Sequence, residues 1–123
     1  MGLDTTHGCW HGAYSAFHRW RVEIARVAGI NLDLMEGFTR DGQQGIKWES
    51  LKPDVLHVLL NHSDCDGHIN WRYTKKLADR LTELLPLLEG DGGGHIGPYR
   101  EKTQEFINGL FVAHEAHERV EFH

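Results

Sequence analysis

The sequence contains few cysteines and no long apolar run, and each shortage excludes a class of protein. Cys9 and Cys65 are the two cysteines among 123 residues, too few for a disulfide-rich secreted domain. No apolar stretch approaches the roughly 18 residues that a membrane-spanning helix needs. The amino terminus, Met1 to Asp4, lacks the basic and apolar segments of a secretory signal. We therefore expect a cytoplasmic protein with two thiols, which has no contact with membranes.

Positive charge is also scarce in this chain. Its 13 lysines and arginines are outnumbered by 18 aspartates and glutamates, for a formal charge of −5, and the basic residues form no dense cluster. Nucleic acid is therefore not an expected partner. With 40% hydrophobic and 25% charged residues, the composition is typical of globular proteins, and the length suits one domain. We predict a single domain over residues 1–123.

Three segments show the spacing of amphipathic helices. The first follows a turn at residues 8–12, and Gly29 can end it; its apolar stripe comprises Ala13, Phe17, Trp20, Ile24 and Val27. The second is predicted over Trp71 to Leu85 and is ended or bent by Pro86. The third begins at Pro98, and the residues that share one of its faces are Tyr99, Thr103, Phe106, Leu110, Ala113 and His117.

Three short segments are predicted as strands. Residues 2–7 form an opening strand, Val55 to Leu60 a buried one, and Ile46 to Leu51 an edge strand. Together with the helices, these strands predict an α/β or α+β domain of two layers, in which a small sheet is covered by about three helices. Between them we expect a flexible loop at 31–47, with one helical turn near 32–35, and a glycine-rich connector at 90–94.

The central structural prediction concerns two loops. If the opening strand and the strand at 55–61 are parallel neighbours, their carboxyl ends lie together, and the loops 7–15 and 62–68 face one another. Glycines, imidazoles, an indole and a helix start would then surround a ligand. The candidate ligand contacts are His7, Cys9, Trp10, His11, Tyr14, Ser15 and His68. In the alternative interpretation Trp10 belongs to the core, Ser15 caps the helix and Cys9 is an inert thiol.

The hexapeptide at 62–67 contains candidate metal ligands. His62, Asp64 and Asp66 offer one nitrogen and several hard oxygens, which suit manganese, magnesium or zinc. Gly67 allows a tight turn. The alternative is that both aspartates are turn residues that bind backbone amides, and that His62 ends a strand.

The string His-Ser-Asp-Cys-Asp-Gly after an apolar run resembles the His-x-Asp-x-Asp-Gly motif of the DHH phosphoesterases. That resemblance covers six of the 123 residues. It implies a manganese site that hydrolyses phosphate esters, with His62, Asp64 and Asp66 as the metal ligands. Residues 68–70 and the absence of an Asp-His-His string depart from the family pattern.

Two further histidines, His114 and His117, lie three residues apart on the last predicted helix, close enough to share a metal. His117 continues the apolar stripe, so we expect it to point inward as a packed, hydrogen-bonded side chain. Three functions are compatible with these residues: a binder of a polar small molecule, phosphorylated or nucleotide-like, with or without a divalent metal; a metal-dependent hydrolase; and a protein interaction module. We favour the binder, which we expect to be able to form a homo-oligomer.

Overall fold

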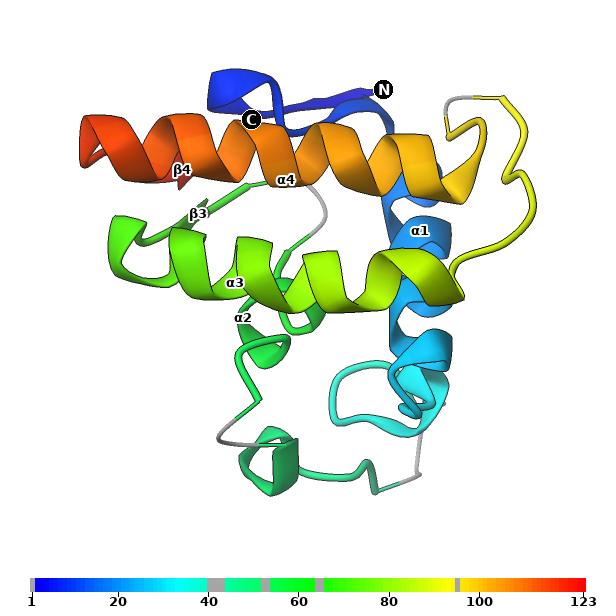
Figure 1. Cartoon of the computed structure of the whole chain (residues 1–123). Coiled ribbons are helices and arrows are strands. Elements are labelled where there is room, and N and C mark those ends of the chain that lie inside the picture. The colour runs from blue at the N-terminus through cyan, green and yellow to red at the C-terminus, as the bar shows by residue number, and fades with distance from the viewer. Residues whose placement is uncertain (1, 40–43, 52–53, 64–65, 95) are drawn as a thin grey trace.

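The computed structural model describes residues 2–39, 44–51, 54–63, 66–94 and 96–123. It has a mixed α+β fold, as the sequence predicts (Figure 1). The helices are α1 (Tyr14–Val27), α2 (His57–Leu60), α3 (Trp71–Leu84) and α4 (Tyr99–Ala116). Short 3-10 turns are η1 (Thr6–Gly8), η2 (Leu32–Leu34), η3 (Trp48–Leu51) and η4 (Leu85–Leu87). The strands are β1 (Gly2–Asp4), β2 (His11–Ala13), β3 (His68–Ile69) and β4 (Val120–Glu121).

The three long helices confirm the predictions from apolar spacing. In Figure 1, α3 and α4 lie side by side, and α1 runs across them. Gly29 has a φ of 81°, a left-handed conformation that glycine adopts without steric cost directly after the end of α1. Pro86 follows the end of α3 and lies in the single turn η4, while Pro98 directly precedes α4.

Large aromatic side chains join these helices in one core. The Trp10 ring lies 5.1 Å from that of Phe17, and the Trp20 ring lies 4.9 Å from that of Phe106. Trp20 Nε1 donates a hydrogen bond of 2.9 Å to Thr103 Oγ1, so the buried indole keeps a partner inside the core. The aromatic core thus fixes how α1 crosses α4.

The prediction of a buried strand at 55–61 is wrong, because His57–Leu60 form the helix α2 and the residues on either side of it are turns. Leu56, Leu59 and Leu60 are fully buried, and their spacing of three and four residues is that of a helix face. The Asp54 carboxylate accepts a hydrogen bond of 3.0 Å from Leu56 N, which starts the turn. A short continuous apolar run is compatible with either structure, since its periodicity does not distinguish them.

The parallel pairing predicted for the opening strand is also wrong. β1 pairs antiparallel with β2, with Leu3 opposite Gly12, and β3 pairs antiparallel with β4, with Ile69 opposite Val120. The carboxyl-terminal residues connect these two small sheets, since Asp4 and His123 exchange backbone hydrogen bonds of 3.1 and 2.8 Å. The amino and carboxyl ends are therefore close neighbours, as Figure 1 shows.

The segment between α1 and α2 differs in part from the prediction. η2 confirms the expected turn near residues 32–35. The edge strand predicted over Ile46 to Leu51 is wrong: Ile46 makes one isolated bridge to Met35, and the chain then turns into η3. Residues 40–43 of the predicted flexible loop lie outside the described residues. None of the helices in the described ranges is both long and apolar enough to cross a membrane.

Candidate functional site

The two loops predicted to face one another are separated by the carboxyl-terminal strand. Phe122 N donates a hydrogen bond of 2.9 Å to Gly67 O on one side. On the other side, Glu121 N donates one of 2.9 Å to Thr6 Oγ1, and Phe122 forms a bridge with Thr5. The carboxyl-terminal residues therefore lie between Thr5 and Thr6, which precede the first loop, and Gly67 in the second.

The candidate contacts in the first loop divide between core and surface. Cys9 and Trp10 are buried, with exposed fractions of 0% and 1%. His7 is half-buried, and its Nε2 lies 3.1 Å from Glu118 Oε1. The remaining candidate side chains are exposed or half-buried: His11, Tyr14, Ser15 and, from the other loop, His68. His11 pairs with Asp4. Burial thus removes Cys9 and Trp10 from the surface, while the other candidate side chains keep part or all of their exposure.

The Cys9 thiol is buried beneath α4, and burial raises its pKa from 9.0 to about 12. We expect alkylation of Cys9 in the folded protein at pH 8 to be at least about a thousandfold slower than in the unfolded chain, since the thiolate is the reactive form. Because the folded state holds the thiol in its protonated form, Cys9 contributes its full stability to the fold below pH 9.0. That contribution is lost as the pH rises from 9.0 towards about 12. The alkylation rate of Cys9 is measured by iodoacetamide labelling and mass spectrometry in a Cys65→Ser variant, which has a single thiol.

The same variant unfolded in urea provides the reference rate for that labelling. Equal rates in the folded and unfolded protein would contradict the buried position of Cys9.

His62 is oriented by its own loop. Its Nδ1 lies 2.7 Å from Ser63 O and its Nε2 lies 3.2 Å from His68 O, while its ring lies 4.1 Å from that of Phe122. Asp64 and Cys65 lie outside the described residues. Within the described ranges, no three His, Cys, Asp or Glu side chains are placed to hold a metal ion. The ligand set of His62, Asp64 and Asp66 therefore stays a prediction.

His117 does not continue the inward face of the last helix, contrary to the prediction. α4 ends at Ala116, and His117 follows with a φ of 56°, a left-handed conformation that turns its exposed side chain away from the stripe. Its ring lies 5.1 Å from that of Trp71, on the outside of the helix pair. The helix ends one residue before the stripe predicts, which explains the error.

A hollow of about 850 Å³ lies elsewhere, between the end of α1, the start of α2 and one face of α3. Its apolar wall includes Ala28, Ile30 and Val55. Its polar wall comes from η3, the turn that leads into α2, and α3, and comprises Ser50, Asp54, Lys76, Asp79, Arg80 and Glu83. Residues distant in sequence thus form one concave surface of mixed character.

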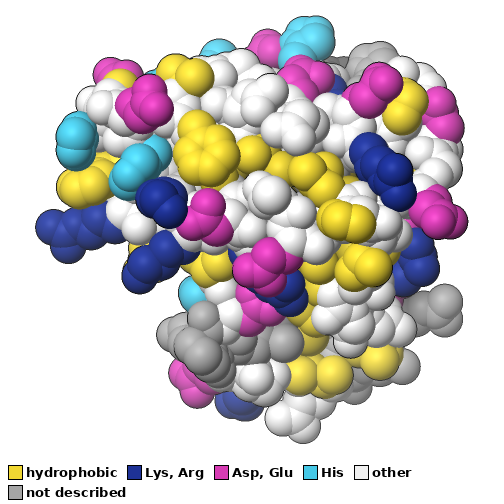
Figure 2. Space-filling view, viewed as in Figure 1, with side chains coloured by type: hydrophobic (Ala, Val, Ile, Leu, Met, Phe, Trp, Pro, Cys, Tyr) yellow, Lys and Arg dark blue, Asp and Glu magenta, His cyan; other side chains and the backbone are white. Residues whose placement is uncertain are grey.

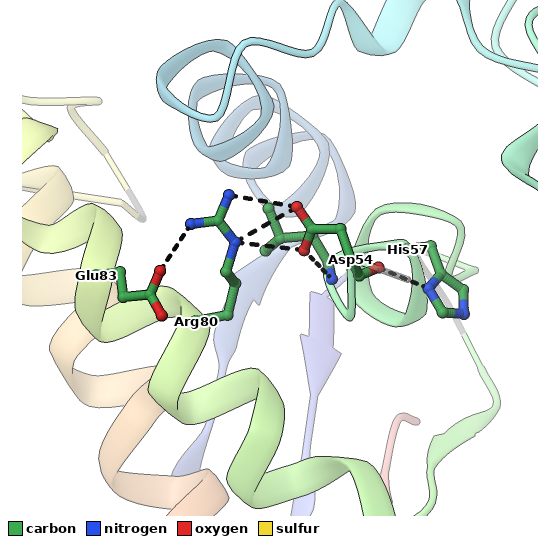
Figure 3. Close-up of polar contacts among 5 residues, drawn as sticks. Asp54, His57, Arg80 and Glu83 are labelled. Carbon is green, nitrogen blue, oxygen red and sulfur yellow. Dashed lines mark hydrogen bonds and ion pairs between the residues drawn. The ribbon is translucent and has the colours of Figure 1, made fainter. Parts of the chain in front are cut away.

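Arg80 is held at this hollow by two carboxylates (Figure 3). Its Nη2 lies 3.3 Å from Asp54 Oδ2, and its Nη1 lies 3.1 Å from Glu83 Oε2. Hydrogen bonding to Asp54 is the main cause of a raised Arg80 pKa, so the guanidinium stays charged. Because Asp54 also accepts the amide of Leu56, the ion pair fixes α2 against α3 and orients Arg80.

The polar face of α3 carries the one sequence signal for this hollow. Lys76 and Arg80 are four residues apart, as are Asp79 and Glu83, so each pair shares a helix face. Such a pattern is also typical of a solvated surface, and sequence alone does not show that Asp54 lies opposite it. Comparison with known proteins finds no matching family model, curated protein or solved structure, so the function has to be argued from this geometry.

Proposed function

We propose that this protein binds a small polar molecule in the hollow between α1, α2 and α3. The observation that carries the proposal is the concave surface of about 850 Å³ in which Arg80 is anchored from two sides. Small-molecule sites of roughly 300–1,000 Å³ usually combine an apolar wall with a few oriented polar groups. The hollow has both, whereas the loops favoured by the sequence are separated by a strand.

The restricted orientation of the Arg80 side chain supports the binding of a ligand in this hollow. Its side chain and that of Asp54 are 27% and 28% exposed, so the pair remains accessible from the hollow while each partner restricts the other. A side chain that is already ordered loses less conformational entropy when a ligand arrives. The apolar wall of Ala28, Ile30 and Val55 gives the ligand's carbon atoms a surface to cover.

The test is a titration of the ¹⁵N-labelled protein with small polar compounds: amino acids, nucleotides, sugar phosphates, sugars, acetate, inorganic phosphate and putrescine, each with and without manganese. We expect at least one compound to shift the amide signals of Ile30, Val55 and Lys76 with a Kd in the micromolar to millimolar range. Val55→Trp, which places a large ring at the wall, should abolish those shifts.

The matched control for that variant is Val112→Trp, on the exposed outer face of α4, where the same ring should leave binding unchanged. Shifts confined to residues 7–15 or 62–68 would contradict this site and favour the one predicted from the sequence. The absence of any shift across the whole panel would contradict the proposed function.

Other expectations accompany this proposal and stay predictions. They are a cytoplasmic location, the formation of homo-oligomers, and a divalent metal on His62, Asp64 and Asp66. Elemental analysis of protein purified without a histidine tag tests the metal. One equivalent of manganese, together with phosphate ester hydrolysis lost in Asp64→Asn, would favour the hydrolase over the binder.

A further inference from the structure

We infer that the ligand of this hollow is a neutral polyhydroxy compound, a sugar or polyol, bound through its hydroxyl groups to Arg80, Glu83 and Asp79. This inference rests on the proposed function, because it assigns a ligand class to the same site. Three features of the hollow carry it: unused donors, unused acceptors beside them, and balanced charge.

Arg80 provides the unused donors. A guanidinium has five N–H groups. Nε, Nη1 and Nη2 each direct one N–H to Asp54 or Glu83. Within the described part of the chain, one N–H on Nη1 and one on Nη2 remain without an acceptor. Figure 3 shows that Asp54 and Glu83 approach the guanidinium from different sides, which holds these two groups in a fixed orientation.

Neighbouring carboxylates provide the unused acceptors. Glu83 bonds Arg80 through Oε2, and Asp79 bonds Lys75 through Oδ2 at 2.8 Å. Among the described residues, no hydrogen bond reaches Glu83 Oε1 or Asp79 Oδ1. A hydroxyl both donates and accepts, so one hydroxyl of a ligand can accept from Arg80 while it donates to Glu83. Adjacent hydroxyls on a sugar ring repeat this arrangement along the α3 face.

The charges around the hollow are balanced, and this disfavours charged ligands. Two cations, Lys76 and Arg80, and three carboxylates, Asp54, Asp79 and Glu83, line the hollow. Lys75, which is outside the lining, offsets the third carboxylate through its 2.8 Å ion pair with Asp79. An anion bound to the free N–H groups of Arg80 would lie beside the carboxylates of Asp54 and Glu83 and be repelled by both. An organic cation beside Glu83 would meet Arg80 in the same way. A neutral ligand avoids both repulsions and does not lose the hydration of a charge.

The surface around the hollow agrees with this balance. On the face shown in Figure 2, acidic and basic side chains lie next to one another in the middle of the view. Lysines and arginines gather with histidines at the left edge, over the start of α3 and the end of α4, and further basic side chains lie at the right of the view among acidic ones. In this arrangement the C–H groups of a bound sugar ring pack against Ala28, Ile30 and Val55, and its hydroxyls reach α3.

The experiment compares three probe classes on the intact protein by amide chemical shifts: neutral sugars and polyols (glucose, galactose, mannose, inositol, maltose), anions (acetate, inorganic phosphate) and an amine (putrescine). We expect at least one sugar or polyol to shift Ile30, Val55 and Lys76 with a millimolar Kd, and a lower affinity for the charged probes. Glu83→Ala should weaken that binding at least fivefold. Its side chain is 67% exposed, so the fold should be preserved.

Glu105→Ala, at an exposed position on α4, is the control and should leave the affinity unchanged. Phosphate, acetate or putrescine binding at these residues without any sugar or polyol would overturn this inference and leave the proposed function standing. Sugar binding that Glu83→Ala does not weaken would overturn the assigned contacts. If no probe of these three classes shifts these amides, this inference fails; the proposed function fails with it when the amino acids, nucleotides and sugar phosphates of the wider panel give no shift either.

Discussion

Replacing Gly109 with alanine is expected to destabilise the folded protein by about 2 to 3 kcal/mol, although alanine forms helices better than glycine by about 1 kcal/mol. Gly109 lies in α4 directly against the turn at residues 7–9. A Cβ there would lie 2.5 Å from Cys9 Sγ, 2.8 Å from His7 O and 2.9 Å from Cys9 Cα. Two of these atoms belong to the backbone, so a change of rotamer does not relieve the contact. Urea denaturation measures the loss.

Asn108→Ala is the matched control for this prediction, because the neighbouring side chain is exposed and gains the same type of helix former without the contact. It should leave the free energy of unfolding equal or slightly higher. In Cys9→Ala/Gly109→Ala, removal of the sulfur should recover part of the loss but not all, since His7 O remains. A Gly109→Ala protein more stable than the parent would contradict the close packing of α4 on this turn.

Arg21→Met is expected to cost about 3 kcal/mol, since buried acceptors that lose their donor cost about 1 to 3 kcal/mol each. Arg21 is 1% exposed in the middle of α1 and donates to the backbone oxygens of Leu60 and His62. Its guanidinium also lies 4.6 Å from the centre of the Phe17 ring. Methionine preserves much of the volume and removes every donor. Chemical denaturation gives the total loss in the free energy of unfolding, and hydrogen exchange should show the largest loss of protection over residues 57–62.

Arg26→Met controls for the loss of an arginine from the same helix. The Arg26 side chain is 64% exposed and pairs with Glu23 on its own helix, so its replacement should change the free energy of unfolding by less than about 0.5 kcal/mol. Equal losses for the two variants would show that Arg21 does not hold α2 and the following loop against α1.

The long helices could be predicted from the sequence, because three or four turns of apolar spacing leave one interpretation. The short elements could not. β3 and β4 have two residues each, too few for an alternating pattern to appear. The run at 55–60 is too short for periodicity to separate helix from strand. The pairing of Asp4 with His123 is decided by contacts between the ends of the chain, which local sequence does not encode.

The candidate site was harder to predict than the fold for a related reason. Glycines beside Cys9 and Trp10 suggested an open loop, but both side chains are large or apolar enough to serve the core. Conversely, Arg80 and Glu83 look in the sequence like part of an ordinary polar helix face, and only the fold shows that Asp54 lies opposite them. That placement depends on α2 being a helix, whereas the apolar run at 55–60 predicts a strand.

The carboxyl-terminal residues, hydrogen bonded on one side to Asp4 and on the other to Gly67, also affect the order of folding. Nearly the whole chain separates Asp4 from His123, so this closure has a high contact order, whereas the α3 and α4 helices are close in sequence. The helix pair should therefore assemble early and the sheet last. In a pulse-labelling experiment on refolding protein, amides of Leu77 and Phe106 would become protected before those of Asp4 and Phe122.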